Sequence, residues 1–339
     1  MKLLKTEDAV GQVLCHDITQ IIRGVTKDAV FRKGHVIREE DIPVLLSVGK
    51  DHVYIWEKEE SMLHENEAAE ILYHLCKGNH MSPTPVKEGK IELIADRDGL
   101  LKVDGKKMRI INSMGQMMIA SRHGNFPVHK GDKLAGTRII PLVIEKEKME
   151  KAKEACGSEP ILNLLPFVHK KVGIVTTGNE VYYGRIQDTF TPVLRQKLKE
   201  YDTEIIGEIL CDDDHEKITA AILQLIHDGA ELVLCTGGMS VDPDDRTPLA
   251  IKNTGAKIIT YGAPVLPGAM FMLGYYNEHL PIVGLPGCVM YAKRTIFDLV
   301  LPRLMADDPV TAEELAALGE GGLCLNCSVC TFPNCGFGK

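Results

Sequence analysis

The sequence predicts an α/β fold whose second half is a doubly wound, mainly parallel sheet. Three segments of this half, KVGIVTT, ELVLCTGG and LPIVGLPG, are almost entirely apolar, as expected of parallel strands that are covered on both faces. Between them lie two segments with helical periodicity, TPVLRQKLKEY and HEKITAAILQLIHDG; Asp213 is the expected N-cap of the second, with Glu216 completing a capping box. This alternation favours a doubly wound sheet, which we place at residues 171–306.

The composition is that of a soluble globular protein. The chain has 339 residues, enough for two or three domains, of which 45% are hydrophobic and 25% charged. A formal net charge of -8 argues against a nucleic-acid-binding surface, since phosphate binding over a broad face needs clustered Lys and Arg. No segment reaches the roughly 18–20 consecutive apolar residues of a membrane span, and the charged start MKLLKTEDAV lacks the apolar stretch of a secretory signal. We therefore expect a cytoplasmic protein that binds neither nucleic acid nor membrane.

The first half of the chain is predicted to consist of smaller parts. Residues 1–57 form an α+β lobe in which HVYIW is a strand. Residues 58–90 are a helical linker, in which an amphipathic helix is followed by a loop. Residues 91–145 form a small β-rich domain, with a hairpin around Asp98-Gly99 and a second turn-and-strand pair in KGDKLAGTRIIPLVI. A charged helical linker, EKEKMEKAKEACGSEP, leads from there to the α/β domain.

Glycine and hydroxyl residues follow three of the predicted strands where these end. In doubly wound sheets, ligands bind where strands end and loops lead into helices. Glycine there lets the backbone approach a ligand and exposes N–H groups that bind anions, although a tight turn would also explain each glycine alone. Their occurrence at three strand ends predicts a site for a phosphate-bearing ligand. The candidate binding residues are Thr177, Gly178, Glu180, Thr236, Gly237, Gly238, Ser240, Asp242, Pro286, Gly287 and Cys288.

Carboxylates crowd the same loops, at Glu180, Asp188, Asp242, Asp244 and Asp245. Like charges beside an anion-binding backbone repel one another unless a cation such as Mg²⁺ bridges them to phosphate oxygens. The pattern therefore predicts Mg²⁺ at the strand ends, whereas N-capping of the next helix is the simpler explanation for Asp188. Neither G-x-G-x-x-G after the first strand nor G-x-x-x-x-G-K-[ST] is present, which disfavours ordinary dinucleotide and Walker-type nucleotide binding.

Four motifs, in order, give the second half a specific resemblance. They are T-G-N-E ending at Glu180, Asp188 with a Thr-Pro pair opening the next helix, T-G-G-x-S ending at Ser240 with D-x-T-P starting at Asp245, and G-L-P-G ending at Gly287. This set resembles the molybdopterin-binding domain that molybdopterin adenylyltransferases and molybdopterin molybdenumtransferases share, gephyrin included. The match covers residues 171–304, and the region from Phe31 to Trp56 has a weaker similarity to the molybdenumtransferase branch.

The resemblance implies a pocket for molybdopterin or its adenylylated form, with the glycine-rich loops on the phosphate. It implies that Asp188 and Asp245 are catalytic, serving Mg²⁺ and nucleotide chemistry, and that Ser240 donates to the pterin or its phosphate. The implied function is molybdenum cofactor biosynthesis, by a transferase that takes part in molybdate insertion. We also expect a homo-oligomer and a molybdoenzyme partner.

Three features depart from the molybdenumtransferase pattern. The segment Val265–Met270 has no lysine, where that branch carries a K-P-G-K-P-like segment; Cys288 replaces an Asn, and T-G-N-E replaces T-G-D-E. These departures leave open a non-catalytic protein that binds or carries the cofactor, or an interaction module that kept the fold and lost the pocket. A molybdenum-responsive regulator is disfavoured, because the sequence has neither a helix-turn-helix signal nor a basic patch.

Residues 307–339 are predicted to be a Cys-rich tail. Cys324, Cys327 and Cys330 are spaced C-x-x-C-x-x-C, and Cys335 follows after four residues. In a reducing compartment such a cluster more often binds metal than forms disulfides, and an iron–sulfur cluster and Zn²⁺ are both compatible with four thiols. A flexible thiol-rich tail is the alternative. The six scattered cysteines are expected to be small buried hydrophobes: Cys15, Cys76, Cys156, Cys211, Cys235 and Cys288.

Overall fold

The computed structural model describes residues 2–55 and 60–339 of the chain. Their contacts define two compact units, each built from several segments. Unit 1 comprises the described residues of Met1–Asp96, Val103–Arg122 and Gly131–Asn163; unit 2 comprises Arg97–Lys102, His123–Lys130 and Leu164–Lys339. Within the described ranges, no helix has both the length and the apolar character needed to cross a membrane.

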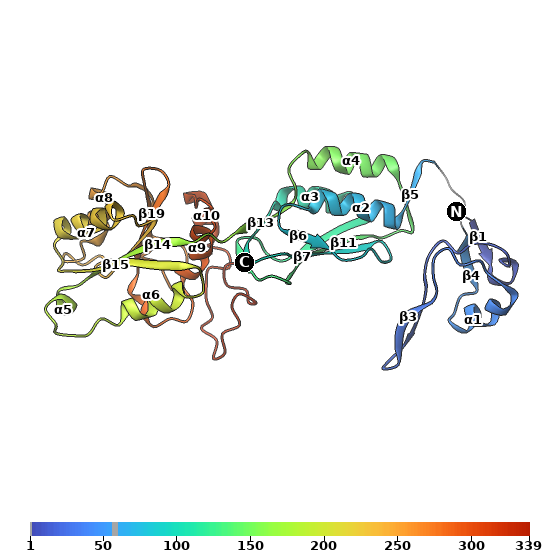
Figure 1. Cartoon of the computed structure of the whole chain (residues 1–339), viewed down its shortest axis with the longest axis horizontal. Helices are drawn as coiled ribbons and strands as arrows, with labels where there is room; N and C mark the ends of the chain where they lie inside the picture. The colour runs from blue at the N-terminus through green and yellow to red at the C-terminus, as the bar shows by residue number, and fades with distance from the viewer. Residues whose placement is uncertain (1, 56–59) are drawn as a thin grey trace. The chain divides into compact units, whose positions relative to one another are not determined.

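Unit 1 begins with a small α+β lobe (Figure 1). Strand β1 (Lys2–Lys5) pairs antiparallel with β4 (His52–Ile55), and β2 (Ile18–Ile22) pairs with β3 (Thr26–Phe31). The strand predicted in HVYIW is confirmed as β4, and its Trp56 lies outside the described residues. The remaining elements are two short 3-10 turns and one helix: η1 (Thr6–Asp8), η2 (Glu39–Asp41) and α1 (Ile42–Ser47). The lobe encloses its own core of Ala9, Leu14, Ile18, Ile37, Leu45, Val53 and Ile55.

The rest of unit 1 is an antiparallel sheet of order β6-β7-β11-β9, with three helices above it in the view of Figure 1. The helices bury their apolar stripes, so that Leu72 of α2 and Met149 of α4 are fully covered. The elements are β5 (Met62–His64), α2 (Glu65–Cys76), β6 (Met81–Pro83), β7 (Lys90–Ala95), α3 (Gly105–Ser113), β9 (Met117–Ser121), β11 (Lys133–Ile139), β12 (Val143–Glu145) and α4 (Lys146–Cys156).

Several expectations for this region are wrong. The strands on either side of Asp98-Gly99, β7 and β8 (Gly99–Val103), do not form a hairpin, since they belong to different sheets. The second expected pair also separates, because β11 pairs with β7 and β9 while β12 pairs with β5. Helix α3 was not expected at all; Asp104 starts it, its carboxylate accepting two backbone N–H bonds. The charged segment before Gly157 is helical as predicted, but as α4 it packs into unit 1 and is not a free linker.

Unit 2 contains a six-stranded sheet of order β15-β14-β16-β19-β18-β17. Strands β15, β14, β16 and β19 are parallel, and β18 runs antiparallel to both of its neighbours. The predicted α/β fold with a mainly parallel sheet is thus confirmed. The strands are β14 (Lys170–Thr177), β15 (Thr203–Cys211), β16 (Leu232–Thr236), β17 (Lys257–Tyr261), β18 (Met272–Tyr276) and β19 (Leu280–Leu285). A three-stranded sheet precedes them: β10 (Phe126–Val128), β8 and β13 (Leu162–Pro166).

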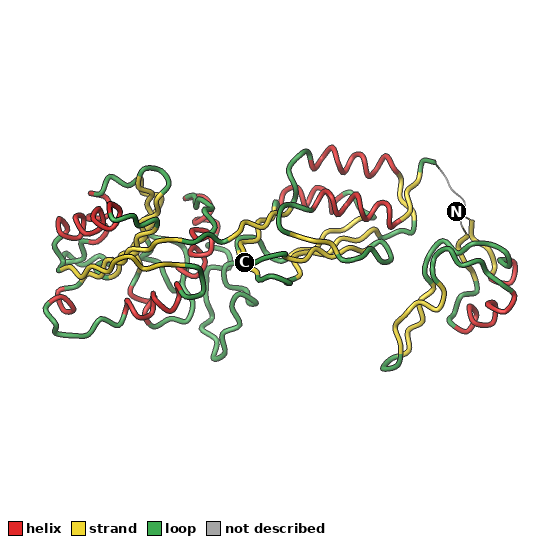
Figure 2. The backbone as a smooth tube through the Cα atoms, in the orientation of Figure 1, coloured by secondary structure: helices red, strands yellow, loops and turns green. Residues whose placement is uncertain are grey.

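Both faces of the six-stranded sheet are covered, as a doubly wound sheet requires. One face carries α7 (His215–His227) and α8 (Thr247–Asn253), which pack on Val175, Val233 and Ile282. The other face carries α6 (Phe190–Leu198) and α9 (Ile296–Met305), which pack on Ile174, Leu234 and Val283. Figure 2 shows helices on both sides of these strands. The shorter helices are α5 (Asn179–Tyr182), η3 (Gly287–Met290) and α10 (Ala312–Ala317).

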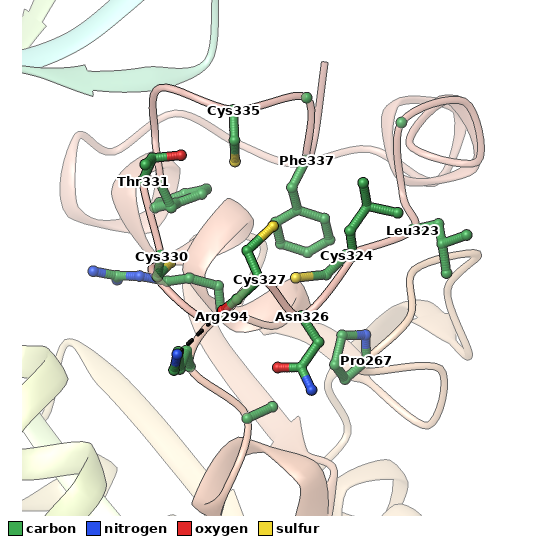
Figure 3. Close-up of a pocket in the computed structure, with 16 residues that line it drawn as sticks. Pro267, Arg294, Leu323, Cys324, Asn326, Cys327, Cys330, Thr331, Cys335 and Phe337 are labelled. Atoms are coloured by element: carbon green, nitrogen blue, oxygen red, sulfur yellow. Dashed lines mark hydrogen bonds between the residues drawn. The ribbon is translucent and has the colours of Figure 1, made fainter.

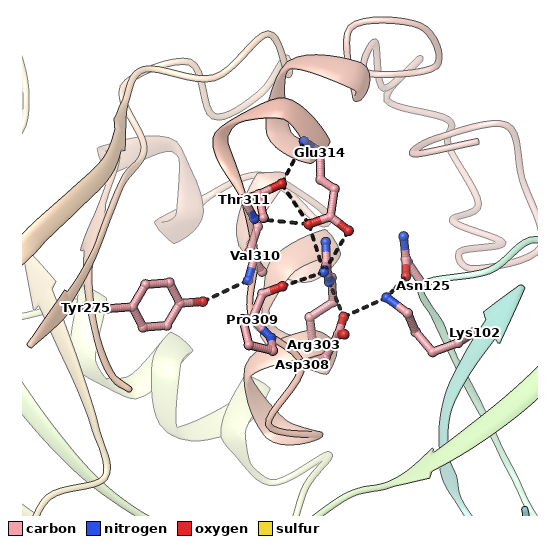
Figure 4. A network of polar contacts seen from close by, with 9 residues as sticks. All are labelled: Lys102, Asn125, Tyr275, Arg303, Asp308, Pro309, Val310, Thr311 and Glu314. Carbon is pink, nitrogen blue, oxygen red and sulfur yellow. Dashed lines mark hydrogen bonds and ion pairs between the residues drawn. The ribbon is translucent and has the colours of Figure 1, made fainter. Parts of the chain in front are cut away.

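A polar network fixes the chain after α9 (Figure 4). The buried guanidinium of Arg303 pairs with Asp308 and with Glu314, at 3.0 Å for the latter, and Lys102 reaches Asp308 at 2.8 Å. Glu314 also completes the capping box of α10 with Thr311. Because a buried charge is costly unless it is paired, this network holds the segment from Asp308 to Glu314 against the end of α9.

Candidate functional site

The three strand ends singled out in the sequence lie at one edge of the sheet. Thr176 of β14 is in register with Thr236 at the end of β16, and Thr236 is in register with Leu285 at the end of β19. The loops after them lead into α5, α8 and η3. Because these strands are parallel, their carboxyl ends form the edge where ligands bind in doubly wound sheets.

Threonine hydroxyls join this edge to the helices that follow. Thr176 and Thr191, at the start of α6, are hydrogen-bonded at 2.9 Å, and Thr177 and Thr247, at the start of α8, at 3.2 Å. The hydroxyl of Thr236 is fully buried and has no hydrogen-bond partner among the described residues. A buried hydroxyl without a hydrogen-bond partner costs free energy. Packing therefore does not account for a threonine, rather than an apolar residue, at position 236.

The glycines of the edge divide into two kinds. Gly237 has φ +83°, and a Cβ there would lie 2.3 Å from the carbonyl oxygen of Thr177, so its turn requires glycine for packing. Gly287 is exposed, has a φ that any residue adopts, and a Cβ there would meet nothing within 4 Å. Neither backbone conformation nor packing therefore requires glycine at position 287. A glycine of this kind is expected where a ligand approaches the backbone closely.

Acidic side chains of the loops after β14 and β16 act electrostatically on Asp213, which follows β15. Burial raises the pKa of Asp213, and the nearby charges of Glu180, Asp245 and Asp244 raise it further. The Asp213 carboxylate accepts a hydrogen bond from the Asn179 N–H at 2.9 Å. These acidic side chains, called the carboxylate cluster below, concentrate negative charge at the ends of β14, β15 and β16.

Asp213 was not among the predicted site residues, and its predicted role as the cap of α7 is wrong. Asp214 caps α7 through the Glu216 N–H, and Asp212 pairs with Lys217 at 2.6 Å, which leaves Asp213 to face Asn179. The available signal was the run of three aspartates directly after a strand. Asn179 is the residue that departs from T-G-D-E, and an Asp there would place a further carboxylate beside Asp213.

Asp245 organises the loop after β16. Its carboxylate accepts the N–H of Ser240 at 2.8 Å, while its own N–H donates to the carbonyl oxygen of Asp242 at 3.0 Å. The Tyr261 hydroxyl donates to the carbonyl oxygen of Met239 at 3.0 Å; burial and then the charge of Asp245 raise the Tyr261 pKa. Asp242 and Asp244 are exposed.

Asp188 takes the simpler of its two expected roles in the structure. One carboxylate oxygen accepts the N–H groups of Phe190 (2.8 Å) and Thr191 (3.1 Å), which caps the start of α6. The neighbouring Thr189 hydroxyl contacts the sulfur of Met290 in η3 at 3.6 Å. Asp188 therefore lies on the η3 side of the edge, and it is not among the carboxylates that raise the Asp213 pKa.

Cys288 is half-buried in η3, and burial raises the pKa of its thiol. The other five scattered cysteines are buried, as expected. In the tail, Cys324, Cys327, Cys330 and Cys335 all line one cavity of about 240 Å³ (Figure 3). Over the described ranges, no three His, Cys, Asp or Glu side chains stand in a metal-ligating arrangement, at either the carboxylate cluster or the tail.

Comparisons with known proteins agree with the geometry of the edge. Residues 173–306 match the family model described as "Probable molybdopterin binding domain", and residues 3–57 match a domain of unknown function, DUF8806. A molybdopterin molybdenumtransferase of Synechococcus elongatus is 27% identical over 180 residues, which are 50% of this chain and 42% of that protein. A CinA-like protein of Mycolicibacterium gilvum is 38% identical over 77 residues, 23% of this chain and 18% of that protein.

Among solved structures, the molybdopterin biosynthesis enzyme MoaB of Thermus thermophilus is 25% identical, with a TM-score of 0.34; the match covers 40% of this chain and 91% of that one. The chain spans less than half the length of the two curated relatives named above. The fold of unit 2 is that of a doubly wound α/β domain. Residues 173–306 match the molybdopterin-binding domain family, as their motifs predicted.

Proposed function

We propose that unit 2 binds molybdopterin, or its adenylylated form, together with Mg²⁺ at the carboxyl edge of the sheet, and that the protein takes part in molybdate insertion. The observation that carries the proposal is the alignment of three glycine-bearing strand ends at one edge of the sheet, where the charges of Glu180, Asp244 and Asp245 act on Asp213. A family that binds molybdopterin supplies the ligand class. Uncompensated carboxylates beside an anion-binding backbone are explained when a cation links them to phosphate oxygens.

The acidic residues at the carboxyl edge offer the oxygen ligands that Mg²⁺ prefers. Mg²⁺ usually takes one or two protein carboxylates and completes its shell with water and substrate phosphates. Asp213 and Asp245 are the expected ligands, and the bound ion would neutralise phosphate charge. Ser240 would donate its exposed hydroxyl to the ligand, and the open space at Gly287 would receive the ligand at the η3 side.

Asp188 retains a catalytic role in this proposal through its second oxygen, since only one accepts the capping bonds. Thr177, Gly178, Thr236, Gly237 and Gly238 shape the loops, and Asp242, Pro286 and Cys288 border the ligand. Transferase activity is supported by the molybdenumtransferase that matches half of the chain. A molybdoenzyme partner, a homo-oligomer and a cytoplasmic location stay predictions.

A second candidate function is carriage of the cofactor without catalysis. It is favoured by the segment Val265–Met270, which has no lysine, and by Cys288 in place of an Asn. The first difference removes cationic groups that would bind an oxyanion, and the second replaces an amide N–H donor by a weakly donating thiol. A carrier would bind molybdopterin at the same edge, so binding and turnover separate the two candidates.

The substitution Asp245→Asn tests whether the Asp245 carboxylate takes part in catalysis. The amide oxygen can still accept the Ser240 N–H, so the loop is kept while the charge is lost. A transferase should lose tenfold or more of its turnover, because about 1.4 kcal/mol at the transition state is a factor of ten. Asp228→Asn, an exposed position after α7, is the matched control. An unchanged rate for Asp245→Asn would exclude catalysis through this carboxylate, and loss of rate in both variants would point to a general effect of charge.

A further inference from the structure

The Cys-rich tail is docked on unit 2 and is not a free segment. The Leu266 N–H donates to the carbonyl oxygen of Gly322 and the Cys324 N–H donates to that of Leu266, both at 2.8 Å. Lys293 donates to the carbonyl oxygens of Cys327 (3.2 Å) and Ser328 (2.7 Å). The tail therefore forms main-chain contacts with two segments that flank the candidate site, 265–270 and the residues after η3.

Aromatic side chains anchor the end of the tail. Phe337 is only 4% exposed and belongs to the main core of unit 2. Phe332 packs between Phe126 and Phe337, and the Arg294 guanidinium lies over its ring, 4.9 Å from the centroid. Cys324 and Cys335 are half-buried against the same core. The tail therefore has apolar neighbours in unit 2, and these contacts fix the course of its backbone.

This docking places all four tail thiols around one cavity of about 240 Å³. Figure 3 shows Cys324 and Cys335 on different segments of the tail, with their side chains directed inward among the residues that line the cavity. All four cysteines are free of disulfides, and no hydrogen bond of their thiols is seen in the described chain. A cluster of four thiols without partners is unusual, since accessible thiols are open to oxidation.

We propose that this cavity holds an iron–sulfur cluster ligated by Cys324, Cys327, Cys330 and Cys335. All four cysteines line the cavity of about 240 Å³. A single tetrahedral Zn²⁺, with sulfurs about 2.3 Å away, needs much less space than this, whereas a multi-iron cluster with its sulfides is a larger ligand. The C-x-x-C-x-x-C spacing is also that of cluster-binding runs. Cys335 follows after four residues, one more than in the ferredoxin-type run, and Gly336 stands where that run has proline.

Charge on the cavity wall agrees with this ligand. Four thiolates are negative, and Lys293 and Arg294 line the cavity. Arg294 is held in place by Asp298 at 2.9 Å and by Glu200 at 3.5 Å. Cations near the sulfurs stabilise thiolates and tune a bound cluster. The proposal goes beyond the function proposed above and does not depend on it.

The test is anaerobic purification of the full chain, with reconstitution by ferrous iron and sulfide. We expect about four iron and about four sulfide per chain, the content of a [4Fe–4S] cluster, and an EPR signal after reduction. Cys330→Ser should weaken iron binding by at least about tenfold, since even outer-shell changes at metal sites have effects of that size. Ser328→Ala, in the same turn, is the matched control and should retain iron and sulfide.

Three results would overturn the proposal. They are one zinc per chain without sulfide, iron and sulfide at background with all four thiols reactive in the folded protein, or equal iron content in Cys330→Ser and Ser328→Ala. Circular dichroism of each variant establishes that it is folded. Titration of the same preparations with molybdopterin separates this outcome from the proposed function, because loss of the cluster need not abolish binding at the carboxyl edge.

Discussion

Replacement by alanine should have opposite effects at the two kinds of glycine at the carboxyl edge: it should destabilise the fold at Gly237 and leave the fold unchanged at Gly287. In Gly237→Ala, the new Cβ would lie 2.3 Å from the Thr177 carbonyl oxygen at a φ of +83°. The left-handed conformation alone costs an L-residue about 1–2 kcal/mol, and the contact with backbone must move one of the two loops. We expect a loss of at least about 2 kcal/mol in the free energy of unfolding, in the range of mutations with a named structural cause.

Gly287→Ala meets nothing within 4 Å, so its free energy of unfolding should stay within about 0.5 kcal/mol of the wild type. If a ligand approaches this backbone, affinity for molybdopterin should nevertheless fall by about tenfold or more, which is about 1.4 kcal/mol. Urea denaturation measures the first quantity and titration calorimetry the second. A wild-type affinity in Gly287→Ala, or a stable Gly237→Ala, would refute the division of the glycines into ligand-facing and structural.

Three further substitutions test the charges of unit 2. Because burial and neighbouring carboxylates raise the Asp213 pKa, its ionised form destabilises the fold at neutral pH; Asp213→Asn should raise the urea midpoint at pH 7, with the gain disappearing as the pH falls below the usual aspartate range. Asn179→Asp should lower the midpoint without Mg²⁺ and increase the stabilisation that Mg²⁺ gives, as melting curves with and without the ion would show. Asp298→Ala should cost about 3–5 kcal/mol in denaturant titrations, since it leaves the buried ammonium of Lys197 without its partner at 2.7 Å.

Apolar strands and motif order were enough to predict the parallel part of the six-stranded sheet. KVGIVTT, ELVLCTGG and LPIVGLPG correspond to β14, β16 and β19, because uninterrupted apolar runs are typical of strands covered on both faces. Unit 1 was harder to predict. Asp98-Gly99 is a strong local hairpin signal, but β7 pairs with β6 and β11 while β8 pairs with β10 and β13, which local turn chemistry does not encode.

The candidate site shows the same limit. The loops were predicted from composition, but the role of each carboxylate depends on which N–H group it faces. Asp188 caps α6 and Asp214 caps α7, whereas Asp213 turns toward Asn179 across the edge. Likewise, the four thiols of the tail are plain in the sequence. The burial of Phe337 in the core of unit 2 could not be predicted, because it depends on long-range packing.

The central claim is that the carboxyl edge of unit 2 binds molybdopterin with Mg²⁺. Titration calorimetry of the purified, folded chain with molybdopterin and with its adenylylated form tests it most directly. We expect saturable binding of at least one form, weakened when Mg²⁺ is chelated and weakened again in Asp245→Asn but not in Asp228→Asn. A folded protein that binds neither form, with or without Mg²⁺, would contradict the claim.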